Sequence, residues 1–411
     1  MDPSLVSTFI KRIDQFILFC FCVLVIFLPI AHTETIRAFA IGIPLGLWII
    51  KAILTRRPLF VRTPLDLPIL LFTLIAGLSV ITAVDPGYSL EEFIREWIRG
   101  ICLFYLVVNN VRHEQMKYIL GALVLGNILM VSYGIFDFFR QGGILFDFKV
   151  RAGSLHSGMG TFGTYLVTII PFILVSLFFV RNPRQFLAIL ILFSLNIFAL
   201  ILNFSLGAWV AMVVLILLVG LKFFPRKVML LSLALFSIGI LFLFFNSDRP
   251  FYHRFTDYST GPNSYNTRWT LTKFSLEKIK GNPLQMIGFG QRSFAKQYKE
   301  FVEKYKEAPM WHAHNTFLNI ALQTGLQGLI LFCFLLYRLL KYCHEKAKLE
   351  ENPLRKFYLT ATFMMVITFF VRNLSDDFFI DDSALLFWFL SGIIFAMEIK
   401  ELDKKHGVGP K

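Results

Sequence analysis

Long apolar runs recur along nearly the whole chain. Hydrophobic residues make up 56% of its 411 residues, charged residues 17%, and the mean hydropathy is +0.64. A soluble domain carries about 25% charged residues, and about 20 consecutive apolar residues cross a bilayer as a helix. Within a bilayer, only helices and closed barrels satisfy every backbone polar group. The sequence therefore predicts an all-α polytopic membrane protein.

We expect twelve transmembrane helices. The apolar runs are 16–31, 36–54, 65–83, 97–111, 118–139, 160–180, 186–202, 206–223, 228–245, 316–340, 357–371 and 385–399. Residues 1–246 then hold the first nine spans, residues 247–312 form one large polar loop with helices of its own, and residues 313–411 hold the last three spans and a tail.

Lysine and arginine indicate how the bundle lies in the membrane. If the N-terminus is cytoplasmic, every short inner loop is basic, as the positive-inside rule requires. The loop after the second span holds Lys51, Arg56, Arg57 and Arg62, and the tail holds Lys400, Lys404, Lys405 and Lys411. This pattern predicts cytoplasmic N- and C-termini and puts the large loop on the outer face.

Much of the net charge of +14 follows from this topology, so it is not the footprint of a nucleic-acid-binding surface. The five cysteines lie in or at the inner edge of expected spans, which indicates neither disulfides nor a zinc site. The first apolar run lacks a small-residue cleavage site, so we expect no cleaved signal peptide. The sequence shows no spaced metal-ligand motif and no nucleotide motif, and we expect neither a metal nor a cofactor.

The large loop keeps a surplus of cations on the side where topology does not require it. Between Asp248 and Glu307 it holds eleven basic and six acidic residues. This favours an anionic substrate such as phosphate groups on a lipid, although anionic headgroups are an alternative partner. Residues 267–280 read as a helix, Gly288-Phe289-Gly290 as a tight turn or a weak phosphate site, and residues 293–306 as an amphipathic helix on the membrane surface.

Two histidines and an amide, His312, His314 and Asn315, stand where this loop meets the span at 316–340. A histidine that is half-desolvated at such a boundary can be tuned for proton transfer. The competing interpretation is an interfacial histidine that only hydrogen-bonds a loop carbonyl.

The segments NPLQMIGFGQRSF, from Asn282, and HAHNTFLNIALQTGLQGLILF, from His312, resemble the shared domain of O-antigen ligases and O-antigen polymerases. The resemblance covers roughly Arg151 onward. It implies a multi-pass protein of the bacterial inner membrane that uses an undecaprenyl-pyrophosphate-linked glycan at the periplasmic face, without a metal. It also implies that His314 is the general base, with His312 as the alternative.

Arginines are the expected ligands of the pyrophosphate, because guanidinium binds phosphate oxygens in pairs. Arg268 is the first candidate, Arg151 the second and Arg372 the third; Arg95 and Arg99, four residues apart on one helix face, are further candidates, as is Asn315 for the substrate. Each arginine has a structural alternative in an ion pair with a nearby acid. Many family members carry serine-arginine-glycine where this chain has Ser205-Leu206-Gly207, so another arginine must replace the missing one or the donor chemistry differs.

The resemblance favours an O-antigen ligase, which transfers a glycan to the lipid A core during lipopolysaccharide synthesis. An O-antigen polymerase uses the same donor with a second lipid-linked oligosaccharide, and a protein O-oligosaccharyltransferase uses a serine or threonine acceptor. A transporter or lipid flippase is the alternative from another class. The sequence argues against it, since we find no repeat of broken helices and no acidic residue deep in a span.

Overall fold

The computed structural model describes residues 3–56, 59–145, 150–156, 158–225, 265–305 and 311–405. These residues form helices and connecting loops, with no strand among them. The first elements are α1 (Pro3–Phe27), α2 (Glu34–Thr55), α3 (Asp66–Ile81), α4 (Pro86–Glu92), η1 (Phe93–Ile98), α5 (Arg99–Asn110), η2 (His113–Gln115) and α6 (Met116–Arg140). They are followed by α7 (Met159–Ser176), α8 (Pro183–Asn203), α9 (Leu206–Phe223), α12 (Tyr265–Gly281), α13 (Ser293–Gln297), α14 (Lys299–Lys304), α15 (Thr316–Leu349), α16 (Pro353–Asn373) and α17 (Asp381–Lys405). The all-α prediction is confirmed for this part of the chain.

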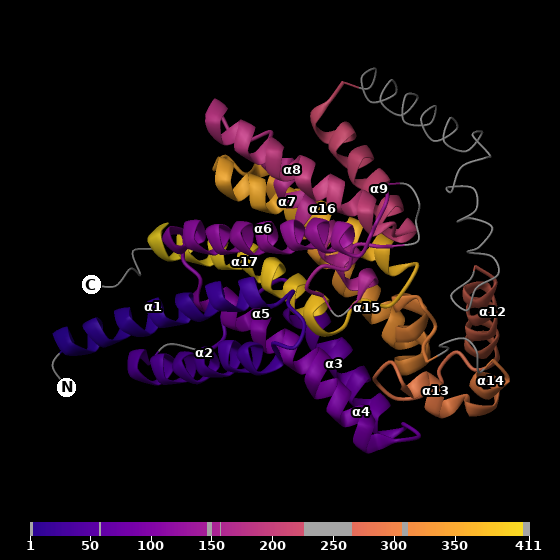
Figure 1. Cartoon of the computed structure of the whole chain (residues 1–411). Coiled ribbons are helices and arrows are strands. Elements are labelled where there is room, and N and C mark those ends of the chain that lie inside the picture. The colour runs from indigo at the N-terminus through magenta and orange to yellow at the C-terminus, as the bar shows by residue number, and fades with distance from the viewer. Residues whose placement is uncertain are drawn as a thin grey trace.

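Seven helical segments of the described residues are long and apolar enough to cross a membrane: Glu34–Thr55, His113–Arg140, Met159–Ser176, Pro183–Asn203, Leu206–Phe223, Thr316–Leu349 and Pro353–Asn373. The chain is thus a multi-pass membrane protein. The expected spans at 65–83 and 97–111 correspond to the shorter helices α3 and α5. The expected span at 228–245 lies outside the described residues, so the total of twelve stays a prediction. Figure 1 shows the start of α1 and the end of α17 at the same end of the bundle.

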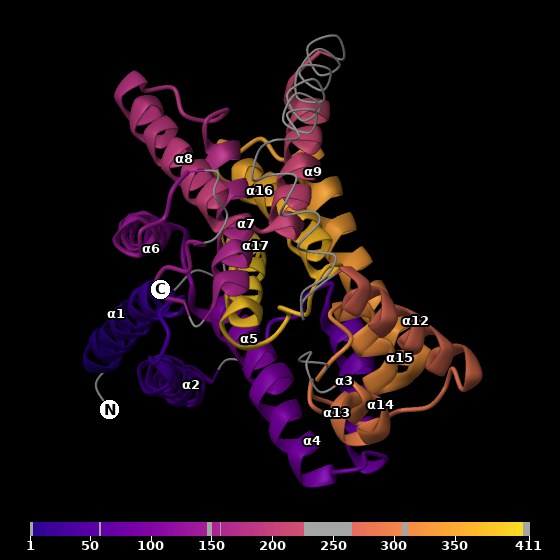
Figure 2. The same cartoon turned by 45° about the vertical axis from the view of Figure 1, so that its right-hand side comes forward.

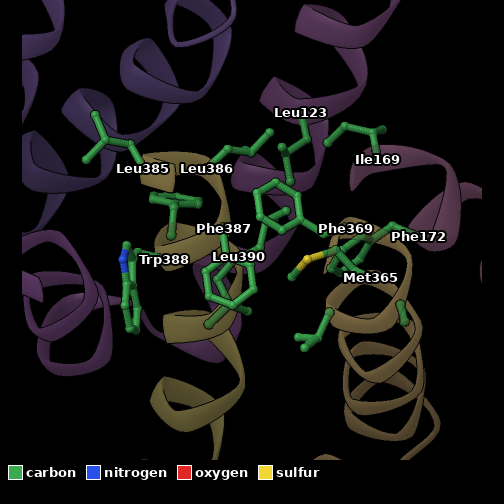
Figure 3. Close-up of a cluster of buried hydrophobic side chains, with 14 of the residues drawn as sticks. Leu123, Ile169, Phe172, Met365, Phe369, Leu385, Leu386, Phe387, Trp388 and Leu390 are labelled. Carbon is green, nitrogen blue, oxygen red and sulfur yellow. The ribbon is translucent and has the colours of Figure 1, made fainter. Parts of the chain in front are cut away.

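The bundle core is densely aromatic and lies around α5, α7, α16 and α17. Phe369 on α16 and Phe387 on α17 have ring centroids 5.4 Å apart, and Figure 3 shows them in one cluster with Met365 and Leu390. Gly100 lets α5 approach α17, because a Cβ there would lie 2.6 Å from the Trp388 ring. Lipid is as apolar as these side chains, so close packing rather than the hydrophobic effect holds such helices together.

Helix α15 is broken at Gly325, whose φ of 73° and ψ of 173° are not helical. A break inside a membrane helix frees backbone groups that need partners. The segment after α12 supplies them: Leu326 N–H donates to the Pro283 carbonyl at 2.8 Å, and Ile287 N–H donates to the Leu322 carbonyl at 3.1 Å. The motif NPLQMIGFGQ therefore closes the backbone of the broken helix. Its glycine turn has a packing role, because a Cβ on Gly288 would collide with Ala83.

Helices α12, α13 and α14 form a lobe against the N-terminal half of α15 (Figures 1 and 2). The expected helix over 267–280 is confirmed as α12. The expected single helix over 293–306 is wrong, because the backbone of Tyr298 (φ −115°, ψ 47°) separates α13 from α14. The apolar side of these two helices packs on Leu271 of α12 and Leu322 of α15 through Phe294, instead of on a membrane surface. Aromatic packing within the lobe, including the Phe274 and Phe301 rings stacked at 3.8 Å, accounts for the interruption.

Candidate active site

The candidate site lies where the segment 311–315 meets α12 and the loop between α16 and α17. Asn315 is the N-cap of α15: its side-chain oxygen accepts from the N–H groups of Phe317 at 2.9 Å and Leu318 at 3.1 Å. Its side-chain NH₂ donates to the Leu374 carbonyl at 3.0 Å. Asn315, expected to contact substrate, thus has its amide engaged in fixing the segment to the α16–α17 loop.

His314 has a strained backbone, with a φ of 47° in the left-handed region that non-glycine residues seldom adopt. The neighbouring Ala313 is fixed by its N–H, which donates to the Asn319 side-chain oxygen at 2.8 Å. His314 Nδ1 lies 2.9 Å from Asp376 Oδ1. A carboxylate accepts only, so Nδ1 carries the proton and Nε2 keeps a lone pair. His314 is therefore oriented as a base through Nε2.

His312 differs from His314 in its tautomer. Its Nδ1 accepts the His314 backbone N–H at 3.1 Å, so the ring proton is on Nε2, 4.0 Å from Asp376 Oδ1. Burial, with the adjacent His314, lowers the pKa of His312 to about 4. His312 is thus neutral at pH 7, and its Nδ1 is engaged by the His314 backbone, which suits a supporting role rather than proton transfer.

Asp376 is the residue that sequence reasoning did not select for the site. Burial alone would raise the pKa of this carboxyl group, but the His314 hydrogen bond and the nearby His314, His312 and Arg268 charges bring it well below its usual range. Asp376 is therefore ionised and can stabilise a positive charge on His314. The adjacent acids Asp376 and Asp377, a few residues after Arg372, were the signal available in the sequence.

Asp377, the next residue, connects the α16–α17 loop to the start of α15. Asp377 Oδ1 lies 2.7 Å from the Thr316 hydroxyl, and its Oδ2 accepts from the Asn319 amide. Both partners belong to the first turn of α15. This buried network ties the α16–α17 loop to α15 and so sets the distance between His314 and Asp376.

Arg268 reaches the site from α12. Its guanidinium donates to the Ser375 carbonyl, and its Nη2 lies 3.6 Å from Asp376 Oδ2. The side chain is 27% exposed. Arg268 thus brings a cation to the same carboxylate that orients His314, and its role as a phosphate ligand stays a prediction.

Comparison with known proteins shows which proteins this chain resembles. Residues 188–333, which include Arg268 and the two histidines, match a family model described as O-antigen ligase. A Rickettsia prowazekii protein named "Putative polysaccharide ligase" is 25% identical over 346 residues, which cover 82% of this chain and 80% of that protein. A Rickettsia felis protein with the same description is 28% identical over 283 residues, which cover 66% of this chain and 67% of that protein. The chain is thus similar to O-antigen ligases, through a domain that spans residues 188–333.

Leu206 stands where many O-antigen ligases and polymerases carry an arginine, and the structure shows what surrounds this position. Arg372, 4% exposed at the end of α16, lies beside the neighbouring Gly207: a Cβ there would be 3.0 Å from Arg372 Nη1 and would collide with the Ser375 hydroxyl. Arg372 donates to that hydroxyl at 2.7 Å and stacks on the Phe378 ring, 4.4 Å from its centroid. A guanidinium group is thus present at the start of α9, supplied by a different helix.

The other arginine candidates have different neighbours. Arg151 Nε donates to the Asn203 carbonyl at 3.0 Å, so it lies at the turn between α8 and α9. Arg95 pairs with Glu92 at 2.6 Å and Glu96 at 3.0 Å, which is the structural alternative given above. Arg99 is the first residue of α5, and its positive charge interacts with that of Arg37 on α2. Arg268 and Arg372 therefore contact the loop that carries Asp376, whereas Arg95 pairs with the separate acidic residues Glu92 and Glu96.

The histidine cluster has the composition of a metal site. Ligand atoms of His312, His314 and Asp376 all lie within 4.8 Å of one another. Such a set suits zinc in its ligand types. The Arg268 guanidinium beside Asp376 opposes a bound cation, and His312 Nδ1 is already used by the His314 backbone. These residues consequently fit a hydrogen-bonded base better than a metal centre.

Proposed function

We propose that this protein transfers a glycan from undecaprenyl pyrophosphate to the lipid A core, as an O-antigen ligase at the periplasmic face of the bacterial inner membrane. The observation that carries this proposal is the hydrogen bond between His314 Nδ1 and Asp376 Oδ1 beside the Arg268 guanidinium. It combines an oriented base with a cation for an anionic leaving group. The large polar loop then lies on the periplasmic side, and both termini are cytoplasmic.

In the proposed reaction, His314 Nε2 accepts the proton of an acceptor sugar hydroxyl. The hydroxyl oxygen attacks the anomeric carbon of the donor, and the bond from that carbon to the pyrophosphate oxygen breaks. The electron pair leaves with undecaprenyl pyrophosphate, so the anomeric configuration inverts. Asp376 stabilises the imidazolium that forms, as a buried carboxylate does in catalytic triads.

The leaving group carries negative charge and needs no protonation where cations stabilise it. Arg268 is the first such cation, because its guanidinium is partly exposed beside the base. Arg372 is the second, because it lies at the start of α9 where the family pattern has an arginine. The donor is already activated, so the proposed chemistry uses no metal and no cofactor. Transfer that is unchanged in excess EDTA is the corresponding expectation.

An O-antigen polymerase is the second candidate. It would use the same base and the same donor, and only the acceptor would be a second lipid-linked oligosaccharide. Nothing in the site geometry depends on the acceptor, so the assay has to separate the two functions.

Complementation of an O-antigen-ligase-null strain tests the proposal. Lipopolysaccharide is separated by gel from cells carrying the wild-type chain, His314→Ala or His312→Asn, with membrane levels of each protein matched. We expect long-chain ladders with the wild type, none with His314→Ala, and reduced ladders with His312→Asn. A polymerase-null strain is run in parallel. Ladders restored only there assign the polymerase function, and restoration in neither strain contradicts glycan transfer.

A further inference from the structure

The outer side of α12 carries a stripe of exposed apolar and basic residues. Trp269, Lys273, Leu276 and Lys280 stand at i, i+4, i+7 and i+11, which places them on one helix face. All four are exposed, Trp269 to 58% and Leu276 to 41%. The opposite face of α12 packs inward, with Leu271 fully buried. The α12 stripe therefore points away from the core of its own lobe.

The α12 stripe begins beside the candidate active site. Arg268, one residue before Trp269, contacts Ser375 and Asp376. Successive helix residues point about 100° apart, so Trp269 stands at the rim of the site rather than inside it. A second tryptophan, Trp311, is 49% exposed and directly precedes His312. Two exposed tryptophans thus adjoin residues of the proposed machinery.

The charge of the surrounding lobe is strongly positive. Residues 265–305 hold eight lysines and arginines and three glutamates. Two of the lysines, Lys273 and Lys280, belong to the α12 stripe itself. A ligand with negative charge is therefore attracted to this surface.

We propose that the α12 stripe, from Trp269 to Lys280, binds acidic sugar units of the glycan that the enzyme transfers; this rests on the proposed function. The face of an indole packs against the apolar C–H face of a pyranose ring, whereas the two lysines pair with sugar carboxylates or phosphates. The stripe is roughly 16 Å long at 1.5 Å per residue. It is long enough for several sugar units leading away from the reacting anomeric carbon at His314.

The position of α12 favours a glycan over a lipid surface. In Figure 1, α12 runs crosswise to α6 and α17 at the end of the bundle opposite the start of α1, with its inner side toward α15. Its exposed stripe thus faces out from the end of the bundle instead of around its apolar girdle. A helix that lies in a membrane surface needs a continuous apolar face, but here each apolar residue is followed by a lysine.

Binding of defined oligosaccharides to the full chain in phosphatidylcholine nanodiscs tests this proposal without turnover. The acidic probe is a hyaluronate tetrasaccharide, and the neutral probe of equal length is chitotetraose; both are titrated by calorimetry. We expect tighter binding of the acidic probe, and weaker binding at high salt. Trp269→Ala should weaken the binding of both probes about three- to tenfold, the range of one aromatic stacking contact. The pair Lys273→Gln and Lys280→Gln should remove the preference for the acidic probe.

Leu284→Ala and Lys299→Gln are matched controls, because both residues are exposed on the same lobe outside the α12 stripe. The proposal is overturned if the wild type binds the two probes with equal affinity or binds neither. It is also overturned if the control variants bind the probes as weakly as the stripe variants do. It is also overturned if the stripe variants lose only binding to phosphatidylglycerol vesicles, which would assign the stripe to the membrane. Complementation with His314→Ala is independent of these titrations, so failure of the stripe and failure of glycan transfer are distinguishable.

Discussion

Replacing Asp376 with asparagine tests the proposed base most directly. Asp376 Oδ1 accepts from His314 Nδ1 at 2.9 Å and from the Asp377 backbone N–H at 3.0 Å. An asparagine of the same shape has a single oxygen, whereas Arg268 faces the second carboxylate oxygen, Oδ2, at 3.6 Å. If the amide oxygen turns to the Arg268 guanidinium, the amide NH₂ takes the place of Oδ1 and faces His314, and Nδ1 has to accept. The proton of the imidazole then moves to Nε2, which can no longer take a proton from the acceptor hydroxyl.

The expected loss follows from what the carboxylate does. Removing a general base costs about 10²- to 10⁴-fold in rate, and the equivalent change in a serine-protease triad costs about 10⁴-fold in kcat. We expect Asp376→Asn to lower kcat by about 10²- to 10⁴-fold. Arg268 keeps its hydrogen bond to the Ser375 carbonyl, so the KM for the donor should change much less than kcat.

The assay uses the purified chain in nanodiscs, with lipid-linked glycan and core acceptor, and follows the product by gel. His314→Gln and the double variant are measured alongside. Residues that act as one unit give non-additive losses, so the double variant should be no slower than the slower single variant. Asp137→Asn is the control, since Asp137 is similarly buried and pairs with Arg140 at 2.7 Å on α6. Asp376→Asn retaining a third of the wild-type kcat, or fully additive losses, would refute this reasoning.

Three further perturbations have defined outcomes. Arg268→Lys cannot span Ser375 and Asp376 with one ammonium group, so the donor KM should rise about tenfold while kcat falls less; an unchanged KM removes Arg268 from the donor site. His312 has a folded pKa of about 4 against about 6.5 unfolded, so the unfolded state binds more protons between these values and stability falls as the pH drops below about 6.5. By pH 5, the free energy of unfolding, followed by thermal unfolding, should fall by about 2 kcal/mol more in the wild type than in His312→Asn. Equal losses in the two proteins would contradict the lowered pKa of His312. Gly207→Ala should displace Arg372 and raise the donor KM, while the control Gly46→Ala, with open space around its Cβ, should leave transfer unchanged.

The membrane bundle and the histidines could be predicted because their signals are local. Each apolar run is continuous in the sequence, and helices such as α6 and α8 follow those runs closely. His314 was selected from its place before α15 together with the family resemblance, and its role stays a prediction. Helix α12 was likewise predicted from its own stretch of sequence, which Gly281-Asn282-Pro283 closes. These features depend on residues within a few turns of one another, which is the range that sequence patterns report.

The remaining features depend on contacts between distant segments. Asp376 acts on His314 from 62 residues away, and nothing in its own neighbourhood indicates which partner it meets. The break at Gly325 is stable because Pro283 and Ile287 supply backbone partners. Apolar periodicity over 293–306 continued through Tyr298, whereas packing of Phe274 against Phe301 set where α13 and α14 separate. In each case tertiary contacts decided the outcome.

The position of Leu206 illustrates how a guanidinium group can lie near a motif whose own arginine is replaced. Read along the chain, leucine between Ser205 and Gly207 removes a cation from the start of α9. In space, Gly207 has no side chain, and Arg372 Nη1 lies 3.0 Å from where its Cβ would be. A guanidinium from α16 needs this absence of a side chain, so the retained glycine and the lost arginine belong to one arrangement. Phosphate recognition depends on where the guanidinium stands, not on which helix supplies it. The altered motif is therefore compatible with pyrophosphate chemistry at His314.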